Sequence, residues 1–332
     1  MAKKSHHVLD IRVWDVEHGS ATYLSAGSKD VVIDCGKNTG DTEFSPLQWI
    51  NGSRYGINSI DYLIISHPHE DHIEDLDVMK ELELAPSIFL RPKSATELVE
   101  AGLEEAREND DDAYIEDAEY YLNKLDEYDG DVETSPSDPT WALDDPRLGR
   151  ARADGGVPTD GVTFHSYGTS DATLGSDRFE KLNNLSRVTV VNSYGFQYVT
   201  MGDLLNQGIT KLKNNASAWS AIEDSEVLVA PHHGRESSYN EELVDHINPD
   251  LVVFSDKADE GNSATDAYRE HASGVSVTHE DTGNTETQYV VTTRKHGRIR
   301  IEASDPDDWE VSISGRDYTT EQAASKRYSN LT

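Results

Sequence analysis

Residues 66–72 form the segment of this sequence with the clearest chemical potential, because they read Ser-His-Pro-His-Glu-Asp-His. Neutral imidazole and carboxylate groups are ligands of zinc, manganese and iron, and the segment holds no thiolate. The spacing of His67 and His69 lets both side chains bind one ion. Asp71 and His72 can bind a second ion nearby. We therefore predict a metal site on the loop that follows the apolar run before this segment.

Two other segments place candidate ligands directly after apolar runs. Asp203 follows a predicted strand and a glycine, and His232 and His233 follow another predicted strand. Each feature alone has an ordinary explanation, since an aspartate after a strand is often a helix cap or turn residue and a histidine pair is often at the surface. Strand ends converge at the site of α/β sheets, so we expect these residues to join the first segment. The sequence leaves open which histidine of the pair is the ligand.

The surrounding pattern predicts an α/β fold. The chain opens with short alternating runs near residues 8–13, 21–25 and 31–34, which predict neighbouring strands. Strand-like and helix-like segments then alternate, and they resume after residue 161. The two apolar runs on either side of His296 and Gly297 predict a β-hairpin.

An acidic segment interrupts this pattern at about residues 95–160, and we interpret it as an insertion in a single domain of residues 1–332. Residues 104–131 contain 13 acidic and 2 basic side chains. Part of the insertion should be helical, and its apolar face either packs on its own domain or contacts a second copy or another protein. The predicted apolar face of this helix consists of Tyr114, Ala118, Tyr121, Leu125 and Tyr128. The residues after about 319 should form a loose tail.

Composition limits the classes of function. The 332 residues include 63 acidic and 29 basic side chains, for a net charge of −34. This charge argues against a general DNA-coating protein, and it indicates either a solvated surface suited to high salt or a preference for small or basic partners. The single Cys35 excludes an intramolecular disulfide. No apolar run is long enough for a membrane span or a signal peptide, so we expect a soluble, cytoplasmic protein without membrane contact.

The motif His67-x-His69-x-Asp71-His72 is the signature of the metallo-β-lactamase superfamily, which this sequence resembles. Within that superfamily it is similar to the soluble domain of ComEC/Rec2-type competence proteins and their stand-alone relatives. Three further segments carry this resemblance, and together they cover about residues 8–94 and 161–301. They read DIRVWDVEHGSATYL with VVIDCG, NNLSRVTVV with YVTMGD, and VLVAPHHGRESS.

The resemblance implies a four-layer αββα sandwich with two divalent ions, preferably zinc or manganese, at one edge. The common pattern has a further histidine ligand between the metal motif and the bridging aspartate, and this sequence has no clear one. His165 is the only histidine in that interval, and Asn183 stands where the ComEC/Rec2-type branch has its asparagine. In the implied site, His67 and His69 bind the first ion, Asp71 and His72 bind the second, Asp203 bridges them, His232 or His233 completes the second site, and Asp34 orients the ligands.

The expected chemistry is hydrolysis by a water molecule that the ions activate. The leading hypothesis is a phosphodiesterase or nuclease that acts on DNA, RNA or a nucleotide. One alternative is a hydrolase of carboxylic esters, lactones, amides or thioesters, and another is a partner-binding regulatory subunit of a defence-type system. The expected catalytic residues are Asp71, Asp203 and His233, and the expected substrate contacts are Arg235, Ser237, Asn183, His18 and Lys257.

Overall fold

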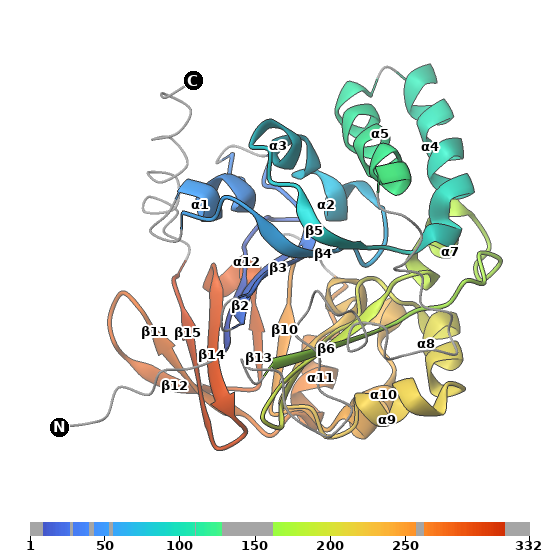
Figure 1. Ribbon diagram of the computed structural model, residues 1–332. Helices are drawn as coiled ribbons and strands as arrows, with labels where there is room; N and C mark the ends of the chain where they lie inside the picture. Colours follow the sequence, from blue (N-terminus) through green and yellow to red (C-terminus); the bar gives the residue numbers. More distant parts are fainter. Residues whose placement is uncertain are drawn as a thin grey trace, which may run out of the picture.

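The fold consists of two β-sheets packed face to face, with helices on both outer faces (Figure 1). The structure is a computed structural model. No helix in the described part of the chain is both long and apolar enough to cross a membrane. The structure describes residues 9–26, 29–39, 43–52, 56–109, 111–127, 162–256 and 262–315.

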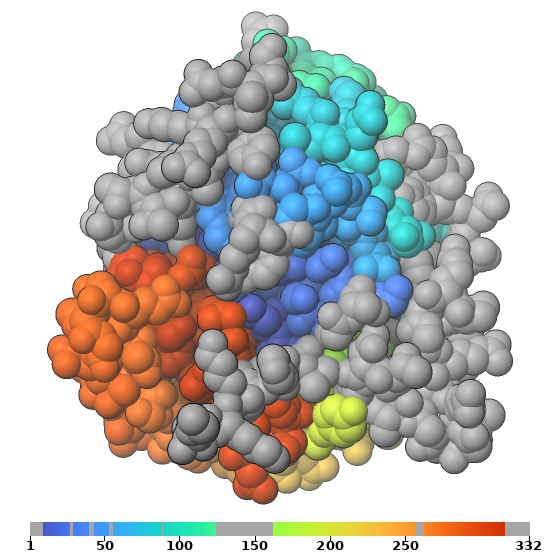
Figure 2. Space-filling view, turned by 60° about the vertical axis from the view of Figure 1, so that its left-hand side comes forward, coloured from blue at the N-terminus to red at the C-terminus, as the bar shows by residue number. Residues whose placement is uncertain are grey.

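The first sheet has nine strands and combines both ends of the described chain. Strand β1 pairs antiparallel with β14, with Leu9 opposite Ala303. Figure 2 shows the result, since the blue N-terminal segment and the orange-red C-terminal strands form adjoining parts of one surface. Its strands, in spatial order, are β12 (Thr285–Gln288), β11 (Val275–His279), β15 (Asp308–Ile313), β14 (Ile299–Asp305), β1 (Leu9–Val13), β2 (Ala21–Ala26), β3 (Lys29–Cys35), β4 (Ile60–Ile64) and β5 (Pro86–Leu90).

The second sheet has six strands, of which the neighbours β13, β10, β9 and β8 run parallel. Parallel strands end at the same edge of a sheet, so the residues that follow β8 and β9 are brought together. Its strands, in spatial order, are β13 (Val290–Thr292), β10 (Leu251–Phe254), β9 (Val227–Val229), β8 (Phe196–Thr200), β7 (Val188–Ser193) and β6 (Val162–Tyr167).

In both sheets, alternate strand residues point inward and form the central core. The residues between them point outward and pack against the helices. This arrangement confirms the predicted αββα sandwich. The nine-stranded sheet is covered by α1 (Pro46–Gly52), α2 (Glu70–Ile73), α3 (Leu76–Glu81), η1 (Lys93–Ala95), α4 (Thr96–Glu108), α5 (Asp112–Glu127) and α7 (Arg178–Asn184), and the six-stranded sheet by α8 (Asn206–Lys213), α9 (Ala216–Ala221), α10 (Glu241–Ile247) and α11 (Thr265–His271).

The acidic segment contributes two helices, α4 and α5, which lie together at one end of the molecule (Figure 1). Tyr114, Ala118 and Tyr121 are buried in the core beneath them. These three residues therefore pack on their own domain, and the interpretation of this face as a contact with a second copy is wrong for them. Outside the described part of the structure lie the side chains of Leu125 and Tyr128, the rest of the predicted insertion after residue 127 and the predicted tail.

The predicted hairpin around His296 and Gly297 is wrong. Strand β13, before these residues, pairs with β10 in the six-stranded sheet, whereas β14, after them, pairs with β1 in the other sheet. The short helix α12 (Thr293–His296) makes this crossing. Both runs have the alternation of a half-buried strand, and alternation does not say which sheet a strand joins.

Candidate metal centre

Three strand ends deliver the predicted ligands to one place. Strand β4 of the nine-stranded sheet leads into residues 66–72, while β8 and β9 of the other sheet lead to Asp203 and to the 3₁₀ helix η3 (Pro231–Gly234). The loops pack closely, because a Cβ on Gly202, which has φ +52°, would lie 2.7 Å from the Cβ of Ser66. A glycine before Asp203 is therefore needed for both its backbone conformation and this close approach.

Four of the predicted ligands, Asp71, His72, Asp203 and His233, form the first cluster. The Nε2 atom of His72 lies 3.2 Å from Oδ1 of Asp203, and the Nε2 atom of His233 lies 3.2 Å from Oδ2 of Asp71. His233 Nε2 also lies 3.4 Å from Oδ2 of Asp203. Two carboxylates and two imidazoles thus face a common point, and we call this group the four-residue cluster.

The second cluster consists of His67, His69 and Asp203, and we call it the three-residue cluster. His67 Nε2 lies 2.9 Å from Nδ1 of His69 and 3.8 Å from Oδ2 of Asp203. Asp203 therefore belongs to both clusters. The carboxylate has one oxygen near His72 and its other oxygen near His67 and His233.

Buried acceptors set the orientation of the histidines in the four-residue cluster. Asp34 is fully buried, accepts hydrogen bonds from the backbone and hydroxyl of Ser66, and lies 2.9 Å from Nδ1 of His72. The Nδ1 atom of His233 lies 2.7 Å from the backbone oxygen of Ser255. Each Nδ1–H donates to its acceptor, which aims Nε2 at the cluster.

Backbone conformation selects between the two neighbouring histidines. His232 and His233 both adopt left-handed conformations, with φ values of 51° and 58°, which are rare and costly for residues other than glycine. This turn places the His233 side chain in the four-residue cluster, where it is buried. The Nε2 atom of His232 is 3.9 Å from Asp203, and its Nδ1 faces the hydroxyl of Ser237 at 3.4 Å.

Charge is balanced within the four-residue cluster. Burial alone would lower the pKa of His233, but Asp203 and Asp71 raise it to about 10. Burial likewise opposes the charged form of His72, yet Asp34, Asp203 and Asp71 raise its pKa well above the usual value. The same pairing outweighs burial at the two aspartates of the cluster and holds their pKa values below the ordinary range. Without a metal, protons on the histidines therefore compensate the carboxylates.

The three-residue cluster has the opposite character. Burial lowers the pKa of His67 well below its usual value, and the nearby His72 lowers it further. Burial also lowers the pKa of His69, to about 4, despite the carboxylates of Asp71 and Asp203. Both imidazoles are therefore neutral at physiological pH and present lone pairs without losing a proton.

These donors fit divalent metal ions. The Nε2 atoms of His72 and His233 are buried and make no hydrogen bond of normal geometry, although carboxylate oxygens lie nearby. Buried nitrogens that face carboxylates without a hydrogen bond suit a cation between them. The mixture of imidazole nitrogen and carboxylate oxygen matches zinc and manganese.

A cavity of about 440 Å³ opens beside the clusters. Three predicted substrate contacts, Asn183, His18 and Arg235, line it. The buried Oδ1 of Asn183 makes no hydrogen bond, and His18 Nε2 is 3.5 Å from Asp71. Ser237 does not line this cavity, and its hydroxyl lies 3.4 Å from Nδ1 of His232. Lys257 lies outside the described residues.

Several cavity residues escaped prediction from the sequence, and one of them is the exposed Phe179 in helix α7. The sequence contains a capping signal for the start of this helix. The side chain of Asp177 accepts a hydrogen bond from the backbone of Glu180, and the Glu180 side chain accepts one from the backbone of Ser176. Asp177 is the N-cap residue, so this pattern differs from a capping box only in that Glu180 reaches the residue before the N-cap. It marks where α7 begins. The other lining residues that escaped prediction are Val16, Glu17, Lys37, Thr39, Glu70 and Glu74.

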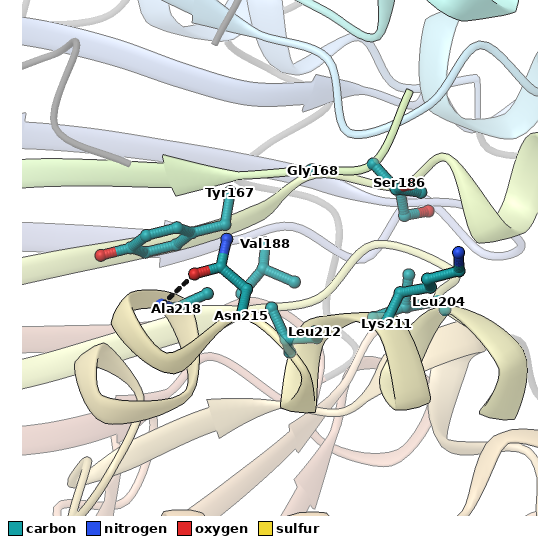
Figure 3. A pocket seen from close by; sticks show the side chains of 11 residues that line it. Tyr167, Gly168, Ser186, Val188, Leu204, Lys211, Leu212, Asn215 and Ala218 are labelled. Carbon is teal, nitrogen blue, oxygen red and sulfur yellow. Dashed lines mark hydrogen bonds between the residues drawn. The ribbon is translucent and has the colours of Figure 1, made fainter. Parts of the chain in front are cut away.

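A second cavity, of about 240 Å³, lies between the six-stranded sheet and helices α8 and α9 (Figure 3). Figure 3 shows Asn215, which bonds to the backbone of Ala218, towards one end and Ser186 towards the other. Ser186 also accepts the backbone N–H of Asp203. No His, Cys, Asp or Glu is among the described residues that line this cavity, so it is not the candidate catalytic site.

Several solved structures are similar to this chain at low sequence identity. Solved structures with similar folds include the metallo-β-lactamase fold protein YhfI from Bacillus subtilis, at 11% identity and TM-score 0.38, with 75% of this chain and 86% of that chain covered. A diphosphatase of the PhnP family matches at 11% identity and TM-score 0.39, with 88% and 98% covered. Human tRNase Z, short form, matches at 14% identity and TM-score 0.32, with 67% and 77% covered.

No protein of curated function matches this chain in sequence. A sequence model of the metallo-β-lactamase superfamily, however, matches residues 14–182, which are 169 of the 332 residues. The match includes the whole of the segment Ser-His-Pro-His-Glu-Asp-His. The chain therefore belongs to the metallo-β-lactamase superfamily of metal-dependent hydrolases.

Proposed function

We propose that this protein is a metal-dependent phosphodiesterase with a dinuclear site. The observation that supports this proposal is the position of Asp203, which belongs to both ligand clusters. Two adjacent ions that share a carboxylate are suited to phosphate esters, because they can stabilise both the attacking and the leaving oxygen. Zinc or manganese is the preferred metal, given the donors.

Each ligand has a proposed place. His67 and His69 would hold one ion, Asp71, His72 and His233 would hold the other, and Asp203 would bridge them. The ions would supply Lewis-acid chemistry and lower the pKa of a water molecule towards neutrality.

The remaining roles fall to the protein's own residues. The carboxylates of Asp71 and Asp203 would accept the proton of the attacking water. His233 is a candidate to stabilise the leaving oxygen. Arg235, which lines the cavity, is a candidate to balance phosphate charge, and His18 and Asn183 are candidates to donate hydrogen bonds to its oxygens. Asp34 would act indirectly, by fixing the ring of His72.

Within the superfamily, we place the chain in the ComEC/Rec2-type branch. This placement is supported by Asn183, which stands where that branch has its asparagine and which lines the cavity beside the clusters. The three-residue cluster then lacks a third imidazole among the described residues. A water molecule or a substrate oxygen would complete the coordination there.

The proposal is tested by metal analysis together with hydrolysis of bis(p-nitrophenyl) phosphate after loading with Zn²⁺ or Mn²⁺. We expect about two ions per chain in the natural protein. Asp203→Ala should retain the fold, bind little metal and lose activity by roughly three orders of magnitude or more, since both clusters lose a ligand. Circular dichroism of both proteins in chelator checks that the variant folds.

Two other outcomes would point elsewhere. Metal-loaded protein that cleaves p-nitrophenyl acetate but no phosphodiester would favour the carboxylic ester alternative. Protein that binds no metal would contradict the enzymatic proposal and favour the regulatory subunit.

A further inference from the structure

An exposed aromatic ring stands at the mouth of the metal-site cavity. Phe179 is 57% exposed and lines this cavity. The other large apolar side chains with high exposure among the described residues are Tyr194 and Tyr289, and neither lines it. Burying a phenylalanine side chain is normally favourable, so its exposure at a cavity is informative.

The ring of Phe179 contacts two side chains. Its centroid lies 5.5 Å from that of His69, a member of the three-residue cluster. The guanidinium of Arg178 lies 4.7 Å from the ring centroid, within the range of a cation–π contact. The part of the ring that these contacts leave uncovered faces the cavity and solvent.

Helix α4 of the acidic insertion supports this arrangement. Arg178 forms an ion pair of 2.7 Å with Glu105 of α4. Gly102 of the same helix lies so close that a Cβ there would be 2.5 Å from Nη1 of Arg178. The inserted helix therefore fixes Arg178, and Arg178 fixes the orientation of Phe179.

We propose that Phe179 stacks on the base of a nucleotide substrate, so that the natural substrate is a nucleotide phosphodiester. This inference depends on the proposed phosphodiesterase function. Every nucleobase offers a π-face to an aromatic ring, and such stacking is a common means of binding without sequence preference. A phosphate at the three-residue cluster would lie one side chain away from Phe179, a separation that a pentose can bridge.

Size and charge favour a single nucleotide unit over a long strand. The cavity of about 440 Å³ is in the range that encloses a small molecule. Glu17, Glu70 and Glu74 line it alongside Lys37 and Arg235. Lys37 is already paired with Asp77 at 3.0 Å. A polyanion would gain little from this surface, because strand binding depends on many exposed cations.

The test compares two diesters with the same leaving group, thymidine 5′-(p-nitrophenyl phosphate) and methyl p-nitrophenyl phosphate. Only the first carries a base. For the natural protein loaded with Mn²⁺ we expect kcat/KM to be roughly 5- to 150-fold higher for the thymidine ester, the range that stacking of one base provides. We expect the difference mainly in KM.

Phe179→Ala should remove that preference, because it should lower kcat/KM for the thymidine ester far more than for the methyl ester. Phe179→Tyr should restore it, since a tyrosine offers the same ring. Tyr194→Ala is the matched control, because it removes an aromatic ring of similar exposure, 56%, that does not line the cavity. An equal loss for both esters in Phe179→Ala would mean a merely structural role and would overturn the inference.

Binding supplies a readout that does not require turnover. Calorimetric titration with thymidine 5′-monophosphate and with methyl phosphate should show tighter binding of the nucleotide, and Phe179→Ala should abolish the difference. Hydrolysis of both esters without preference would refute the stacking role while phosphodiesterase activity stands. Hydrolysis of neither ester would refute the proposed function, and equal binding of the two ligands would then refute stacking as well.

Discussion

The two ligand clusters share Asp203, but their histidines differ in protonation. In the four-residue cluster, Asp71 and Asp203 face His72 and His233, and the pKa values of the histidines are raised. In the three-residue cluster, the pKa values of the two histidines are lowered by burial. When metal is absent, the histidines of the four-residue cluster are therefore protonated. The histidines of the three-residue cluster are neutral and can bind a metal ion without releasing a proton.

The cluster with more ligands for a metal ion is therefore also the one whose histidines must lose protons before the ion can bind. An ion at the four-residue cluster gains two carboxylates and two imidazoles but must displace protons. An ion at the three-residue cluster meets neutral nitrogens and a single shared carboxylate. We expect the first ion to bind at the four-residue cluster and the second to bind more weakly, with a coordination position open to substrate.

The largest effect on this contrast should come from His233→Ala. The four-residue cluster loses one of its own ligands, so its affinity for Zn²⁺ should fall by more than the roughly 10–100-fold that loss of a supporting residue costs. Competition with a chromogenic chelator measures the affinity. His232→Ala is the matched control and should change it little, since His232 is outside the cluster; a larger effect for His232→Ala would reverse the assignment of the pair.

A smaller and more selective effect is expected for Asp34→Asn. An asparagine tolerates the left-handed backbone of Asp34, which has φ +59°, but its amide can donate to Nδ1 of His72. The His72 ring would then carry its proton on Nε2 and could not bind metal there. Affinity at the four-residue cluster should fall by roughly 10–100-fold, with the other cluster less affected. Equal weakening of both ions would show that Asp34 acts on the whole loop instead.

The finest distinction between the clusters is in proton release. At pH 8 an ion that enters the four-residue cluster should release ~1–2 protons, because His233, with a pKa of about 10, and His72 are protonated beforehand. Affinity there should rise with pH up to about pH 10. An ion at the three-residue cluster should release none above the pKa of His69, about 4.

Calorimetry in buffers of different ionisation enthalpy counts these protons, and His67→Ala and His233→Ala isolate one cluster each. The four-residue cluster remains intact in His67→Ala. Equal numbers of released protons in the two variants would show that the two clusters do not differ in the protonation of their histidines.

Much of the candidate site could be predicted from the sequence because each ligand follows directly on an apolar strand. The ends of β4, β8 and β9 had to converge once an α/β sandwich was assumed, so residues as distant as His67 and Asp203 could be associated. The choice between His232 and His233 could not be predicted. It depends on two consecutive left-handed residues, and no local preference of histidine indicates that conformation.

Other features depend on packing that a pattern does not contain. Phe179 looks like an ordinary core residue in the sequence, and its exposure follows from contacts with His69 and Arg178 across different elements. The runs that form β13 and β14 have similar alternation, but they join different sheets. Sequence periodicity indicated that each was a strand, and only tertiary pairing determined its partner.

The origin of the ligands has a consequence for folding. Asp71 and His72 belong to the nine-stranded half of the sandwich, whereas Asp203 and His233 belong to the six-stranded half. An ion bound there would therefore cross-link the two halves non-covalently, and a chain in which they have not yet docked could not offer the full set of candidate ligands. Metal should thus bind the native state far more tightly than the unfolded chain, so that free metal concentration, through this linkage, tunes resistance to heat and proteolysis.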